Sequence, residues 1–126
     1  MLNKHGFSVP DWEQAKIEAT NALIKVARRK GRIAYSELIP KILSISMEAH
    51  DSRLFHLLDE ISTAENAEGR GMLTAVVVHK SGDMQPGPGF FELAKSLGKD
   101  TSDVLACWIN EFNHVHNYWA NKQCQT

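Results

Sequence analysis

Apolar side chains recur at three- and four-residue steps in three long segments, and this spacing limits the fold more than any other feature. Because an α-helix has 3.6 residues per turn, the spacing places these side chains on one face of a helix. The three segments are residues 11–30, 52–67 and about 100–119. The first segment ends in Arg-Arg-Lys and is followed by Gly31, and cations followed by glycine are a typical helix stop. The sequence therefore predicts a mainly helical protein.

Shorter elements are predicted between and after these helices. Residues 32–35 predict a short extended segment, and residues 37–43 predict a short helix with a proline in its first turn. Residues 72–79 contain a β-branched run and predict a strand. Residues 90–97 predict a short helix that is closed by Gly98.

The chain predicts a single α+β domain, because 126 residues is an ordinary length for one domain and no linker divides it. Three helices, a strand and a turn follow one another in the order of a winged helix-turn-helix core with a small β-hairpin. This core would span residues 11–90. Residues 1–10 would form a loosely ordered arm, and residues 91–126 would add two C-terminal helices.

Residues 31–38, Gly-Arg-Ile-Ala-Tyr-Ser-Glu-Leu, resemble the entry into the winged helix of the DNA alkyltransferase family and its alkyltransferase-like relatives. The likeness continues in spacing and topology to about residue 90. It implies a winged-helix framework and its usual use on DNA. Thr74 stands where that family has its alkyl-accepting cysteine, and the His and Arg of the family motif are absent. Because a threonine with no base beside it is a poor nucleophile, alkyl transfer is not implied.

Charge is distributed unevenly along the chain, although the formal net charge is only -1. Residues 1–45 carry eight Lys or Arg against four Asp or Glu, whereas residues 46–69 carry one Arg against six acids. The basic first third predicts contact with the phosphates of duplex DNA, with residues 52–67 as the recognition helix. The residues expected to contact DNA are Arg28, Arg29, Lys30, Arg32, Arg53, His56 and Lys80.

The acidic helix leaves a second interpretation open. Asp59, Glu60 and Glu65 would repel DNA phosphates, and they predict instead that residues 52–67 face a protein partner. The protein would then be an interaction module or an accessory subunit of a larger complex. The C-terminal helix carries large aromatic side chains that predict either core packing or a homodimer interface. These side chains are Trp108, Phe112 and Trp119.

No pattern in the sequence predicts a catalytic or metal-binding constellation, which favours a non-enzymatic protein without a cofactor. His114 and His116 are two residues apart, and on a helix such residues point away from each other and cannot share one ion. A lower-ranked alternative is a small enzyme with a pocket near the loop rich in proline and glycine. The residues expected around that pocket are His79, Pro86, Gly87, Gly89 and Phe90.

Cysteine use and hydropathy predict the compartment. Cys107 and Cys124 are far apart and form no disulfide framework, which fits a reducing compartment. The first residues lack the apolar run of a signal peptide, and the longest apolar run, residues 75–78, is too short to span a bilayer. These features predict a cytoplasmic protein with no membrane partner.

Overall fold

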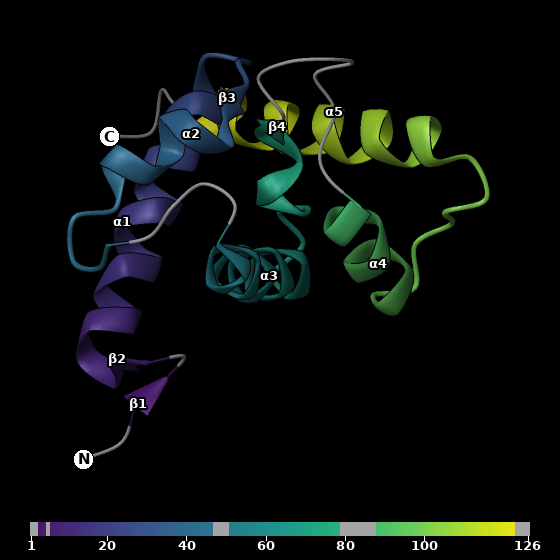
Figure 1. Ribbon diagram of the computed structural model, residues 1–126. Helices are drawn as coiled ribbons and strands as arrows, with labels where there is room; N and C mark the ends of the chain where they lie inside the picture. The colour runs from purple at the N-terminus through teal and green to yellow at the C-terminus, as the bar shows by residue number, and fades with distance from the viewer. Residues whose placement is uncertain (1–2, 5, 47–50, 79–87, 123–126) are drawn as a thin grey trace.

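A computed structural model describes residues 3–4, 6–46, 51–78 and 88–122, and its fold is mainly helical (Figure 1). Three long helices dominate it: α1 (Val9–Arg28), α3 (Ser52–Ala67) and α5 (Val104–Lys122). The shorter α4 (Pro88–Ser96) contacts α3 and α5, and Figure 1 shows α3 between α1 and α4. None of the helices in these ranges is long and apolar enough to cross a membrane.

The first helix begins earlier than the apolar spacing predicts. The Ser8 hydroxyl accepts a hydrogen bond from the Asp11 backbone N–H at 3.2 Å, and Pro10 lies in the first turn, so α1 begins at Val9 rather than at Asp11. Before it, β1 (Asn3–Lys4) and β2 (Phe7–Ser8) pair as an antiparallel hairpin. The first ten residues, expected as a loosely ordered arm, therefore contain a hairpin and the start of α1.

The end of α1 is closed by backbone hydrogen bonds around Lys30. The Lys30 N–H donates to the Ala27 carbonyl at 3.0 Å, and the Gly31 N–H donates to the Val26 carbonyl at 2.9 Å. This pair of bonds is the Schellman arrangement, which requires a left-handed residue just past the helix. That residue is Lys30, with φ of 55°, and not the glycine that follows it.

The short helix predicted over residues 37–43 forms two residues earlier and is divided. After β3 (Ile33–Ala34), α2 covers Tyr35–Leu38, and the 3-10 turn η1 covers Ile39–Lys41. The Glu37 carboxylate accepts a hydrogen bond from the Ala34 N–H at 2.9 Å, and this bond caps the start of α2.

The strand predicted over residues 72–79 is wrong for most of its length. The 3-10 turn η2 covers Leu73–Val76, and only Val77–Val78 form a strand, β4. All residues from Gly71 to Val78 are buried, so the run lacks the alternation that would identify a strand. His79 and most of the turn expected after it lie in residues 79–87, outside the described part of the chain.

The short strand after the first helix, β3, pairs with β4, and the two run parallel. Ile33 pairs with Val77, and Ala34 pairs with Val78. Parallel strands need a long crossover connection, which is supplied here by the segment that contains α2, η1 and α3.

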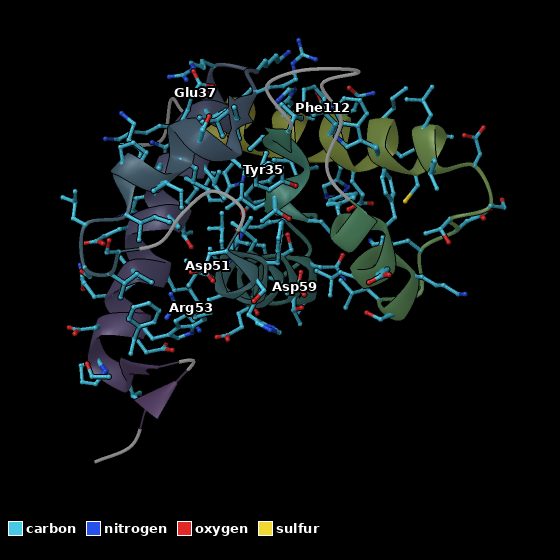
Figure 2. All side chains as sticks on the ribbon, in the orientation of Figure 1. Tyr35, Glu37, Asp51, Arg53, Asp59 and Phe112 are labelled. Atoms are coloured by element: carbon cyan, nitrogen blue, oxygen red, sulfur yellow. The ribbon has the colours of Figure 1, made fainter. Side chains whose placement is uncertain are left out.

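Two apolar clusters form the core, with η2 contacting α1, α3 and α5 at the centre. The larger cluster joins α1 to α3 and includes Trp12, Leu23 and Leu57, all fully buried. The smaller cluster lies between η2, α4 and α5 and includes Met72 and Trp108. Phe112 of α5, labelled in Figure 2, packs against both clusters.

Candidate nucleic-acid interface

Four cationic side chains meet beside the C-terminal half of α1. Two adjoining hollows, with volumes of about 350 and 510 Å³, lie between this half of α1 and the segment from β3 to η1. Both hollows include Arg29, Ile33 and Lys41; the first adds Lys25 and the second adds Arg32. We call the surface defined by Lys25, Arg29, Arg32 and Lys41 the basic groove.

The carboxylates along the basic groove are occupied by backbone and hydroxyl donors. Glu18 accepts hydrogen bonds from the backbone N–H groups of Leu43 and Ser44 and from the Ser44 hydroxyl, each at 2.9 Å. These bonds, chiefly the one from the Ser44 backbone, lower the pKa of Glu18 and keep it ionised. Glu37 is used to cap α2. Among the described residues, no carboxylate forms an ion pair with any cation of the groove.

The predicted basic cluster at residues 28–32 divides between two surfaces. Arg29 and Arg32 line the basic groove, and both are exposed. Arg28 lies instead over the Trp119 ring of α5, with its guanidinium carbon 5.9 Å from the ring centre. Lys30 is exposed, and it is itself the residue with left-handed backbone that follows α1. For a non-glycine residue that conformation is unfavourable by roughly 1–2 kcal/mol.

In α3, the predicted recognition helix, Arg53 contacts other side chains of the protein. Its guanidinium pairs with Asp51 at 2.7 Å and lies over the Phe7 ring, 4.5 Å from the ring centre. Figure 2 shows this pair at the start of α3. His56 is exposed on the same helix. Arg53 is not among the residues that line the basic groove.

Of the three acidic residues of α3 that predicted a protein partner, two form ion pairs with side chains of the same chain. Glu60 accepts from the Trp12 indole N–H at 3.2 Å and pairs with Lys16 at 2.9 Å. Glu65 is buried and pairs with Arg70 at 2.6 Å. Asp59 is half-buried, and burial raises its pKa. The face of α3 expected to be acidic therefore carries less exposed negative charge than the sequence indicates.

The predicted enzyme-like pocket lies only partly within the described residues. His79, Lys80, Pro86 and Gly87 fall outside them. Gly89 and Phe90 border a hollow of about 20 Å³, close to the space that one water molecule occupies. The other residues around this hollow are Tyr35, Phe55, Leu58, Asp59 and Thr74.

Thr74, at the position of the alkyl-accepting cysteine in the resembling family, is part of the core. Its hydroxyl lies 2.5 Å from the Ser62 hydroxyl, and its backbone N–H donates to the same Ser62 oxygen at 3.1 Å. Both residues are buried. The pair satisfies polar groups between α3 and η2, which is a structural role.

The aromatic side chains of α5, for which core packing and a homodimer interface were the two predictions, pack against the core. Trp108 is buried, and its indole N–H donates to the Ala75 carbonyl at 2.8 Å. Phe112 and Trp119 are partly buried against the larger cluster. The exposed large apolar residues of α5 are instead Val104, Leu105 and Ile109.

The histidines of α5 bind backbone carbonyls. His114 Nε2 lies 3.1 Å from the Gly69 oxygen, and His116 Nε2 lies 2.9 Å from the Gly31 oxygen. Glu111 accepts from the Met72 N–H at 3.1 Å and lies 3.5 Å from Lys99. In the part of the chain that the structure describes, no group of three His, Cys, Asp or Glu residues is arranged to hold a metal ion.

Two residues of the basic groove were not predicted. Lys25 lies four residues before Arg29 on α1, and helical spacing alone could have added it to the cluster. Lys41 could not be found in this way, because it reaches the groove only through the path of α2 and η1.

Comparisons with protein-family models, with curated proteins and with solved structures return no match for this chain.

Proposed function

We propose that this protein is a non-enzymatic, winged-helix-like module that binds duplex DNA through the phosphate backbone. The observation that carries the proposal is the basic groove, where four cations converge without a paired carboxylate among the described residues. Lys and Arg in such a surface bind phosphates and release the counterions condensed on DNA.

The element order and the resemblance support the winged-helix part of the proposal. A short strand follows the first helix, and a second short strand, which pairs with it in parallel, follows the third helix. The resembling segment, residues 31–38, supplies Arg32 and leads directly into the wall of the basic groove. The wing itself would fall within residues 79–87, outside the described part of the chain.

We assign the main DNA contact to the basic groove rather than to α3. Arg53 is engaged by Asp51, whereas Arg29 and Arg32 project from an exposed surface. A contact made only through phosphates positions the protein on DNA and carries no base information. The proposal is therefore for binding with little sequence preference.

The alternative, a protein-interaction module acting through the acidic helix, has less support. Glu60 and Glu65 are held by Lys16 and Arg70 and are not offered as a negative surface. The cations of the groove have no such partners among the described residues. This contrast favours a polyanion over a basic protein as the ligand.

The test is the salt dependence of binding to a covalently closed duplex, a dumbbell that contains only internal phosphates. We expect wild-type affinity to fall steeply with salt, and the double variant Arg29→Gln with Arg32→Gln to bind more weakly. The slope of log K against log salt should decrease by roughly 0.9 for each phosphate contact removed. Fluorescence anisotropy measures both quantities.

The matched control is Lys95→Gln, because Lys95 is an exposed cation that does not line the groove. It belongs to α4, which Figure 1 shows on the other side of α3 from α1. The control variant should leave the slope unchanged, and replacement of both arginines by lysine should retain most of the binding. A wild-type protein that does not bind the dumbbell at low salt would refute the proposal.

A further inference from the structure

The basic groove is closed at one end. Along α1 the residues that line it run from Glu18 through Asn21 and Lys25 to Arg29, and the second hollow continues past Arg29 to Arg32 and Ser36. At the Glu18 end, three hydrogen bonds join α1 to residues 43–44, which follow the opposite wall. The lining residues therefore extend from the Arg32 end to these hydrogen bonds at Glu18, and we call the Glu18 end the closed end of the groove.

The charge of the closed end fits a single dianion. Lys25, Arg29 and Lys41 contribute three positive charges to the first hollow, and the ionised Glu18 contributes one negative charge. The resulting net charge of +2 is opposite in sign and similar in size to that of a phosphomonoester, which carries about -1.5 to -2 at neutral pH. An internal phosphodiester carries one charge, and the strand beyond it would have to pass the Glu18 carboxylate.

The floor of the groove fits a sugar better than a base. Ala22, Val26 and Ile33 supply apolar surface, and Asn21 and Ser36 supply neutral hydrogen-bonding groups. The described lining residues include no aromatic ring, and proteins that hold unpaired bases usually stack them on such rings. The volume of about 350 Å³ is within the range of small-ligand sites.

We propose that the closed end of the basic groove is a binding site for a terminal phosphate on a sugar, either the phosphorylated end of a DNA strand or a free nucleotide. We call this binding site the seat. In the seat, Lys25, Arg29 and Lys41 bind the phosphate oxygens, and the sugar lies on the apolar floor towards Arg32. This inference rests on the groove that carries the proposed function, but it adds recognition of an end.

The experiment compares short duplexes with 5′-phosphate, 3′-phosphate or hydroxyl ends, and uses a thymidine monophosphate competitor to separate the two sources. We expect one phosphorylated end to bind about tenfold more tightly than the hydroxyl end, the size expected for one charge-assisted hydrogen bond. Lys25→Gln should remove this preference, and Lys95→Gln should preserve it. Thermal unfolding checks that both variants are folded.

Competition by thymidine monophosphate shows whether the ligand is a free nucleotide or the phosphorylated end of a DNA strand. If the mononucleotide binds as tightly as the phosphorylated duplex and depends on Lys25, the seat serves a free nucleotide; if it binds more weakly, the seat serves strand ends. Equal affinity for phosphate and hydroxyl ends, or a preference that survives Lys25→Gln, would overturn the inference.

The dumbbell duplex separates the two proposals. Binding of the dumbbell without any end preference would leave the backbone-binding function standing and remove the end seat. Preference for phosphorylated ends without dumbbell binding would keep the seat and remove general backbone binding.

Discussion

His116 connects the C-terminal helix to the loop that carries the basic residues. Its Nε2 atom contacts the carbonyl of Gly31, which lies between Lys30 and Arg32. The side chain is buried, and its ring lies 4.0 Å from the centre of the Phe112 ring. Burial lowers the pKa of His116 because it disfavours the imidazolium; the Gly31 carbonyl acts in the opposite direction, and Lys30 adds to the lowering.

This lowered pKa predicts a loss of stability in mild acid. The unfolded chain binds a proton at His116 near the ordinary pKa of about 6.5, whereas the folded chain binds it only at lower pH. The contribution of His116 is therefore fully present above that pH and is lost as the pH falls towards the folded pKa. Thermal unfolding of wild type between neutral pH and about pH 5 should show a falling Tm.

His116→Gln keeps a donor near the Gly31 carbonyl and does not titrate, so it should flatten this part of the profile. Asn117→Gln, an exposed and non-titrating position on the same helix, is the control and should leave the wild-type profile in place. An identical acid loss in wild type and His116→Gln would assign the effect to other groups.

Single residues show what the sequence could predict about the interface. Arg29 and Arg32 were predicted as phosphate contacts and do lie together on an exposed surface, although DNA binding itself stays a prediction. Arg53 was predicted with them, but Asp51, two residues earlier, holds its guanidinium. The sequence places the two residues close together, yet only side-chain geometry decides that they pair rather than face solvent.

At the scale of elements, Gly71 sets how closely α5 approaches the start of η2. It has φ of 87°, and a Cβ atom there would lie 2.8 Å from His114 Cδ2 and 3.2 Å from Val115 Cγ2. Gly69 has a similar φ of 79° but no atom within 4 Å of the corresponding position. Comparing a substitution at Gly71 with the same substitution at Gly69 therefore distinguishes the cost of crowding against α5 from the cost of backbone strain.

We expect Gly71→Ala to destabilise the protein more than Gly69→Ala. Both add the left-handed strain of roughly 1–2 kcal/mol. Gly71→Ala adds overpacking against α5, typically about 1–3 kcal/mol. Urea unfolding of the two variants measures the difference, and equal losses would show that α5 shifts aside without resistance.

Element boundaries were predicted well where local chemistry fixes them. The helix over residues 52–67 has the predicted limits, because Asp51 caps its start and Gly69 closes its end. The strand over residues 72–79 was predicted wrongly for the opposite reason. A short run that is buried on every side has no periodicity, so local sequence cannot separate a 3-10 turn from a strand.

At the scale of the whole molecule, Phe112 joins the two apolar clusters. Its ring packs edge-on against Trp108 of the smaller cluster, with centres 5.4 Å apart, and also contacts the larger cluster. Sequence spacing placed Phe112 on the apolar face of the last helix. It could not show that this face spans two clusters, because that depends on the position of η2 between the long helices.

Phe112→Ala should therefore weaken the entire domain, by about 3 kcal/mol, the lower end of the range for such truncations because the ring is only partly buried. Phe55→Ala is the control, since the Phe55 side chain is 37% exposed and a smaller loss is expected. Far-ultraviolet circular dichroism and tryptophan fluorescence should report one coincident transition in wild type. Two separate transitions would show that the clusters unfold independently.

At Lys30, in the left-handed turn after α1, thermal stability and ligand binding favour different residues. Glycine would occupy that backbone conformation without steric penalty, yet the position carries a positive charge next to Arg29 in the chain. Laboratory selection for heat resistance alone would favour the exchange of Lys30 for glycine. Selection for affinity towards a polyanion would favour the lysine, so the two selections would favour different residues at this position.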